Sequence, residues 1–324
     1  MIETLHLALS NLLAPAVLFF LRGFAAGWFR SDLSVPESVA KALAMILMLS
    51  IGFKGGVEAS RAGLSLDFVK AAGAGMILSF GIPVIAFAIL RMAARLERTT
   101  AAATAAHYGS VSIVTFVAGT EFLTAGGVAF GGYMVAVVAL METPAILSAL
   151  LLAGAGAAGR HGLRGDLMRE VVLNGSVVLL IGSFLIGAAT GERGMAKLDV
   201  FVGPVFQGVL VLFLLDMGLL AARRLREART LTPRLVAFAI GMPLVSCALA
   251  LALSVLLGLS PGDAAVLSLL AASASYIAAP AAMRIALPSA DPGIYLTLSL
   301  AVTFPFNLVI GIPLYSAVTA LVVR

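Results

Sequence analysis

Long runs of apolar residues dominate the chain and are separated by short segments that contain charged residues, Gly or Pro. A helix that crosses a bilayer needs about 20 mostly apolar residues. The pattern predicts ten such helices, over residues 5–21, 38–57, 68–90, 100–120, 128–152, 171–190, 200–222, 235–258, 264–287 and 294–322. The runs are continuously apolar and lack the period of two that a β-barrel requires. The sequence therefore predicts an all-α polytopic membrane protein with ten transmembrane helices.

The composition agrees with this prediction and excludes several classes of protein. Hydrophobic residues make up 61% of the chain and charged residues only 11%, too few to cover the surface of a water-soluble fold. A soluble enzyme, a nucleic-acid-binding protein and a disordered scaffold are therefore excluded. The single cysteine, Cys247, rules out an internal disulfide framework, and three histidines without cysteine partners argue against a zinc site. No cofactor is expected apart from a coupling ion.

The distribution of Lys and Arg predicts the orientation of the chain. Most of the 21 basic residues fall in loops that lie inside if both termini are outside. The positive-inside rule therefore predicts an even number of spans in the inner (plasma) membrane, with both termini on the outer, periplasmic side. The basic run 223–234 is expected to contact anionic membrane lipid. The first apolar run lacks a basic segment before it, so we interpret it as a span and not as a signal peptide.

Similar stretches occur in the same order in the two halves of the chain. The pairs are 47–56 with 213–222, 108–114 with 271–277, and 141–147 with 303–309. Because each half has five spans, an odd number, the second half is inverted relative to the first. Inverted repeats are typical of secondary transporters, whose substrate site lies near the midplane. We therefore predict repeats over 1–158 and 171–324 joined by a cytoplasmic linker over 159–170, and favour a transporter over a membrane scaffold or channel.

The fourth and ninth predicted helices are interrupted by small polar residues, and Pro280 adds a residue that cannot donate a backbone hydrogen bond. A break inside the membrane leaves backbone groups unpaired, which is too costly unless they line a cavity or bind a ligand. Helix N-termini suit an anion, whereas carbonyl and hydroxyl oxygens suit a small cation. We expect the two broken helices to cross at the midplane and form one site. The alternative is that Ser and Gly only allow close helix packing.

Candidate substrate-binding residues share these two breaks: Tyr108, Gly109, Ser110, Val111, Ser112, Ser273, Ala274, Ser275 and Tyr276. Candidate cation-binding or coupling residues carry an oxygen near a break or a carboxylate inside a span: Ser112, Thr115, Ser275, Glu142, Thr143, Asn307 and Asp216. An ionisable group inside a span is a functional candidate by default. Glu142 could hold a cation or a proton, and Asp216 could instead extend toward Arg223 or Arg224. The expected metal is sodium alone.

Four stretches, 103–116, 212–225, 272–296 and 303–315, carry a resemblance to a known family. Over nearly its whole length the chain resembles the sodium-dependent bicarbonate transporter family first known from cyanobacteria. The resemblance implies ten spans in two inverted repeats, a gate domain of spans 1, 2, 6 and 7, and a core domain of spans 3–5 and 8–10. It also implies a homotrimer that binds bicarbonate and sodium between the broken helices, here at 109–112 and 273–276.

The chain departs from the family pattern at Tyr276, where an acidic residue is usual, and at Pro280-Ala281, where a double proline is usual. Its linker is short, which argues against binding of the family's PII-like regulatory partner. We expect a non-cyanobacterial branch that imports a small anion, bicarbonate coupled to sodium, by an elevator-like alternating-access movement of core against gate. The alternatives are a proton- or sodium-coupled organic-acid transporter and a membrane anion sensor or scaffold that does not transport.

Overall fold

The computed structural model describes residues 13–62, 65–154, 175–228 and 231–323, and within these ranges the chain is helical, with no strand. The helices in chain order are α2 (Pro15–Trp28), α3 (Glu37–Ala62), α4 (Leu66–Met92), α5 (Arg98–Gly109), α6 (Ile113–Ala125), α7 (Met134–Leu152), α9 (Gly175–Val200), α10 (Phe206–Glu227), α11 (Pro233–Leu257), α12 (Pro261–Ala271), α13 (Ala278–Ala286), α14 (Pro292–Leu296), α15 (Phe304–Phe306) and α16 (Ile312–Val322). Three π-helical segments join some of them: η1 (Phe201–Val205), η2 (Thr297–Thr303) and η3 (Asn307–Gly311).

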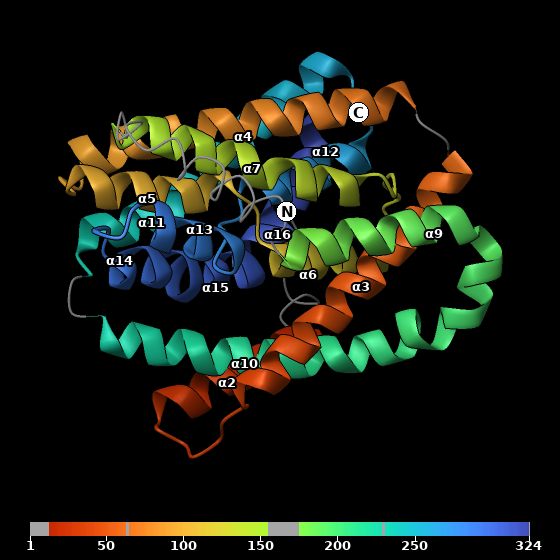
Figure 1. Cartoon of the computed structure of the whole chain (residues 1–324), viewed down its shortest axis with the longest axis horizontal. Helices are drawn as coiled ribbons and strands as arrows, with labels where there is room; N and C mark the ends of the chain where they lie inside the picture. The colour runs from red at the N-terminus through yellow and green to blue at the C-terminus, as the bar shows by residue number, and fades with distance from the viewer. Residues whose placement is uncertain (1–12, 63–64, 155–174, 229–230, 324) are drawn as a thin grey trace.

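Seven helical stretches of the described residues are long and apolar enough to cross a membrane. They are Glu37–Arg61, Leu66–Met92, Arg98–Ala125, Met134–Leu152, Val178–Glu227, Pro233–Leu257 and Pro292–Val322. The stretch Val178–Glu227 contains most of α9 and all of α10, between which the chain reverses direction (Figure 1). The all-helical, multi-pass membrane fold is thus confirmed, whereas ten spans in two inverted repeats stay a prediction. The linker 159–170 and the beginnings of the first and sixth predicted spans lie outside the described residues.

Capping residues in the sequence decide where several helices begin. Ser65, Thr232 and Ser260 each accept a hydrogen bond from a backbone N–H in the first turn of the helix that follows, α4, α11 or α12. Glu97 caps α5 in the same way through the N–H groups of Thr99 and Thr100, and these bonds lower the pKa of the Glu97 carboxyl. The helix bounds therefore follow from local chemistry as well as from hydropathy.

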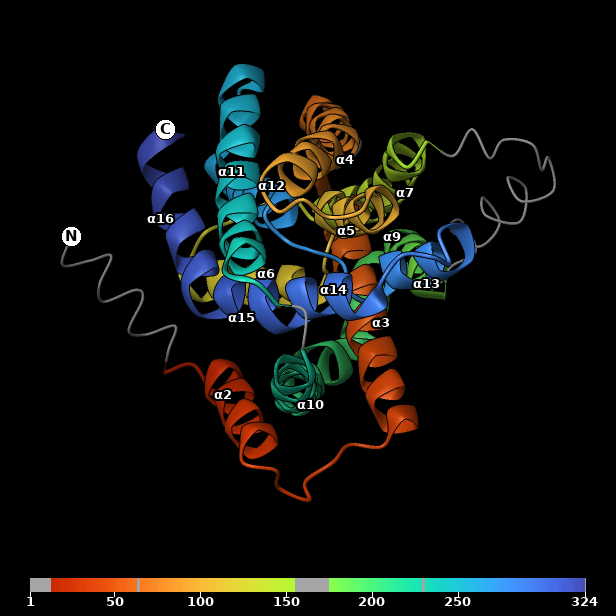
Figure 2. The ribbon, with the colours of Figure 1, turned by 90° about the vertical axis from the view of Figure 1, so that its left-hand side faces the viewer.

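Two helix pairs pack closely because glycine lets their backbones approach. Helix α2 packs against α10, and α3 packs against α9. A Cβ atom on Gly218 of α10 would overlap the carbonyl oxygen of Phe20 in α2, and one on Gly56 of α3 would overlap that of Phe184 in α9. Small residues at membrane helix contacts commonly serve this purpose. Figure 2 shows α2 and α10 on one side of the molecule and α4, α5, α11 and α12 on the other.

Candidate functional site

The first predicted interruption is a short extended segment between α5 and α6. Helix α5 ends at Gly109, and α6 begins at Ile113. Ser110 and Ser112 have extended backbones, with φ/ψ of −82°/168° and −99°/110°. The Ser112 hydroxyl oxygen caps α6 by accepting a hydrogen bond from the Thr115 N–H at 3.2 Å. Two helix ends of opposite polarity therefore meet within this segment.

The second interruption separates α12, which ends at Ala271, from α13, which begins at Ala278. Ser273 donates its hydroxyl hydrogen to the Leu270 carbonyl at 2.7 Å. The Ser275 hydroxyl oxygen accepts a hydrogen bond from the Ala279 N–H, in the first turn of α13, at 3.2 Å. Pro280 lies in the first turn of α13, where a missing N–H costs no helical hydrogen bond. Pro280 therefore fits the restart of the helix after the break.

Two hydrogen bonds join the interruptions directly. The Ser112 N–H donates to the Ser273 hydroxyl oxygen at 2.9 Å, and the Ser275 N–H donates to the His107 carbonyl at 2.7 Å. All four residues are buried. Backbone groups that a helix break frees in a water-poor interior must find partners elsewhere. Here each interruption provides a partner for the other, which holds the two segments side by side.

A small cavity lies between the interruptions, and Glu142 of α7 is one of its walls. Its volume is about 10 Å³, which is room for about one water or dehydrated ion. The lining residues are Val111, Ser112, Ile113, Glu142, Ser275, Tyr276, Ile277 and Ala278. Glu142 is 3% exposed and forms no ion pair with a described residue. Buried charges in proteins are normally paired or bound to a metal ion, so the cavity is suited to a cation.

The N-terminal ends of two helices line the same cavity. Ile113 begins α6 and Ala278 begins α13, and both line the cavity. A helix N-terminus carries partial positive charge and free N–H groups, so it favours a nearby negative group. That group is either the Glu142 carboxylate or a bound anion. The arrangement thus combines oxygen donors for a small cation with dipoles that favour an anion.

Asn307, in η3, is hydrogen-bonded to the second interruption. Its side-chain N–H donates to the Ala272 carbonyl at 2.8 Å, and its amide oxygen accepts from the Tyr315 hydroxyl at 2.7 Å. Asn307 is fully buried. The bond to Ala272 links η3 to the residue that directly follows α12. Because both ends of the amide have protein partners, Asn307 can position the break without contacting an ion.

We expect Asn307→Ala to destabilise the protein by about 1–3 kcal/mol, since it leaves the Ala272 carbonyl and the Tyr315 hydroxyl buried without this partner. Thermal unfolding in detergent measures the change. The control is Tyr315→Phe, which removes one of the two hydrogen bonds and should have a smaller effect. Equal stability of Asn307→Ala and the native protein would contradict the bracing role.

The structure does not bring all the predicted residues to this cavity. Thr143 is half-buried on α7 and Asp216 is half-buried on α10, and neither lines it. The suggested Asp216–Arg223 pair is not formed either: Arg223 donates to the Leu33 carbonyl, and no described ion pair includes Asp216. The hydroxyls of Ser110 and Thr115 are buried without a hydrogen-bond partner among the described residues.

Three residues that form or support the candidate site were not predicted from the sequence. The His107 carbonyl accepts the hydrogen bond from the Ser275 N–H of the second interruption, and the His107 ring stacks on Tyr295 with centroids 4.5 Å apart. Tyr315 supports Asn307, and Ile277 supplies an apolar wall. Every residue has a backbone carbonyl, and apolar residues occur throughout this sequence. Neither can therefore be recognised as part of a site from residue type, and only the tertiary structure could identify them.

Together, the helical membrane fold and the buried polar site between two helix interruptions are typical of secondary transporters. The sequence model of the Na⁺-dependent bicarbonate transporter superfamily matches residues 15–320, and the chain belongs to this family. This match confirms the resemblance seen in the sequence. Comparison with curated proteins finds no match to the chain.

Proposed function

We propose that the protein imports bicarbonate together with sodium across the inner membrane by secondary active transport. The observation that supports this function best is the cavity between the two hydrogen-bonded interruptions, in which a buried carboxylate meets two serine-containing segments. A cavity with room for about one dehydrated ion favours a small cation there and argues against a large organic acid. Sodium is the coupling ion in this proposal, and no other cofactor is required.

The cation is held by oxygen atoms in this proposal. Glu142 provides a negative charge, and the hydroxyls of Ser112 and Ser275 provide neutral ligands on the same cavity. Carboxylate, hydroxyl and carbonyl oxygens suit hard cations. Thr115 lies in the first turn of α6, and its hydroxyl, which has no partner among the described residues, is a further ligand if the segment adjusts. Thr143 and Asp216 are outside the cavity walls and are less directly supported.

The anion binds beside the cation, at the backbone of 109–112 and 273–276. The N-termini of α6 and α13 supply positive dipole ends there. Sodium neutralises Glu142, and the dipole ends are then free to stabilise the charge of bicarbonate. This order of charge compensation makes anion binding depend on the cation, which is the basis of coupling.

Transport occurs, in this proposal, by an elevator-like alternating-access movement of a core domain against a gate domain. The gate contains α2, α3, α9 and α10, and the pairing of α2 with α10 and of α3 with α9 supports it. A cleft of about 650 Å³ lined by α2, α10, α6 and α16 separates parts of the two domains, and a Gln207–Glu121 hydrogen bond joins α10 to α6 across it. We also propose that the chain has ten spans in two inverted repeats, that both termini lie on the outer side of the membrane, and that the protein is a homotrimer.

Uptake of labelled bicarbonate into proteoliposomes, with and without an inward sodium gradient, tests this function. We expect uptake that requires the sodium gradient. Uptake that is indifferent to sodium would refute the coupling, and uptake of an organic acid in place of bicarbonate would refute the substrate. Labelled-anion counterflow separates a transporter from a sensor or scaffold, because a scaffold gives no exchange.

A further inference from the structure

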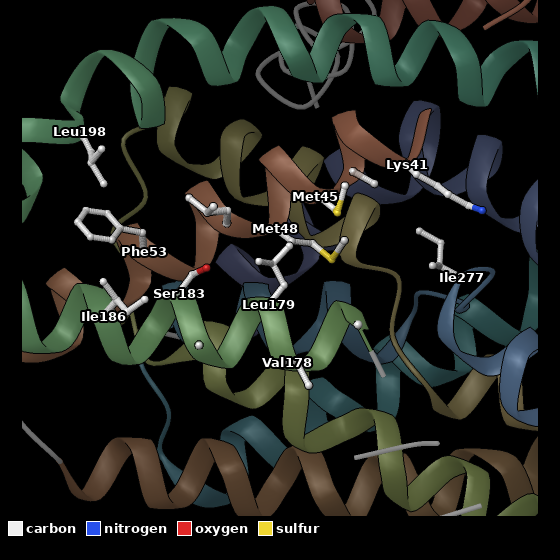
Figure 3. A pocket seen from close by; sticks show the side chains of 14 residues that line it. Lys41, Met45, Met48, Phe53, Val178, Leu179, Ser183, Ile186, Leu198 and Ile277 are labelled. Atoms are coloured by element: carbon white, nitrogen blue, oxygen red, sulfur yellow. The ribbon is translucent and has the colours of Figure 1, made fainter. Parts of the chain in front are cut away.

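A large apolar groove lies between α3 and α9 and shares one lining residue, Ile277, with the polar cavity. Its volume is about 920 Å³, and side chains including Met45 and Met48 of α3 and Leu179 of α9 form its walls. Figure 3 shows these three side chains between the two helices. Among the described residues that line the groove, Lys41 is the only charged one. The groove is therefore apolar along its length and basic at one place.

The dimensions of the groove match one leaflet of a bilayer. Lys41 lies at one end and Phe53 and Leu198 lie at the other (Figure 3). The twelve-residue step from Lys41 to Phe53 along α3 spans about 18 Å at the helical rise of 1.5 Å per residue. Half of a typical hydrocarbon core is about 15 Å. The groove is therefore long enough to hold an acyl chain over a length comparable with one leaflet.

The charged end of the groove fits a phosphate headgroup. The Lys41 ammonium pairs with the Glu37 carboxylate at 2.7 Å, and both side chains are largely exposed, at 71% and 83%. An exposed ion pair of this kind contributes little to stability, so the ammonium remains available to a second anion. Basic residues beside membrane helices commonly contact phospholipid headgroups. The opposite end of the groove, at Phe53 and Leu198, is apolar.

We propose that this groove is a binding site for a phospholipid, with an acyl chain between α3 and α9 and the phosphate at Lys41. The site also touches the ion cavity, because Ile277 lines both the groove and the cavity. A bound acyl chain therefore contacts the segment between α12 and α13. The lipid-binding proposal does not depend on which ion the protein transports.

The test compares two glycine variants of the full-length protein by native mass spectrometry, after reconstitution with phosphatidylethanolamine and detergent washing. Gly182 lines the groove and Gly241 of α11 does not, and a Cβ atom on either glycine meets open space. We expect one retained phospholipid per native chain and about tenfold less in Gly182→Leu, since leucine displaces about two methylenes of the lipid. Gly241→Leu should retain the native amount.

A second variant tests the headgroup contact at an exposed position where folding is not at risk. Lys41→Met should lower phospholipid retention about fivefold, the effect of one basic residue at a membrane surface. The absence of retained phospholipid on the native protein, or equal retention by all variants, would overturn the proposal. So would a change in the number of chains per particle in Gly182→Leu without lipid loss, because a second copy would then occupy the groove.

Discussion

The variant Glu142→Gln is expected to reduce sodium-dependent bicarbonate uptake by about 100-fold while leaving the protein folded. Glutamine keeps the size of the side chain but removes the negative charge that faces the cavity. A charged hydrogen-bonding or ion contact is worth about 1.5–3 kcal/mol, and about 2.7 kcal/mol corresponds to 100-fold in binding. Labelled bicarbonate uptake at several sodium concentrations measures the loss and shows whether higher sodium restores transport.

The matched control for this prediction is Glu192→Gln. Glu192 is an exposed carboxylate that pairs with Arg61 and does not line the cavity, and loss of an exposed ion pair costs about 0–1 kcal/mol. We expect this variant to transport normally. Native uptake in Glu142→Gln, with unchanged sodium dependence, would remove Glu142 from the site and leave the serines and backbone to bind the ions alone.

The variant Gly218→Leu is expected to lower the melting temperature in detergent by about 10 °C. A Cβ atom at Gly218 overlaps the Phe20 carbonyl oxygen and lies 2.7 Å from the Phe24 amide nitrogen, so α2 and α10 must separate. Overpacking against backbone that cannot rotate away costs about 3 kcal/mol, and each kcal/mol shifts the melting temperature of a chain of this size by about 2–4 °C. Thermal unfolding followed by circular dichroism measures the shift.

Gly208→Leu is the control on the same helix. A Cβ atom on Gly208 meets nothing within 4 Å, so leucine there is tolerated without displacing α2. We expect its melting temperature to stay near that of the native protein. If both variants unfold at the native temperature, the α2–α10 contact does not require glycine, and the gate domain in our proposal loses its main structural support.

Helix positions could be predicted well where an apolar run ends at charged or capping residues. The predicted span 68–90 corresponds to α4 over Leu66–Met92, and 235–258 corresponds to α11 over Pro233–Leu257. The sixth predicted span ends at residue 190, before a segment with four charged residues, but α9 continues to Val200 through a change of direction at Gly191. Hydropathy reports burial in the bilayer, and a helix can extend beyond it.

The candidate site was predictable as a set of residue types but not as an assembled geometry. Ser112, Ser275 and Glu142 are conspicuous because polar groups inside apolar runs need a reason, and the structure brings them to one cavity. Asp216 gives the same sequence signal and does not join them. Distance along the chain carries no information about which polar groups meet, since α7 and the two interruptions come together only when the helices pack.

The sequence by itself determined that this is a helical membrane protein, where its helices are interrupted and to which family it belongs. Composition and the cost of unpaired backbone in lipid decide these features locally. Only the tertiary structure decided that the two interruptions share hydrogen bonds, that Glu142 faces them and that a groove runs between α3 and α9. These features depend on helix packing, in which backbone carbonyls and apolar walls matter as much as the side chains that a sequence displays.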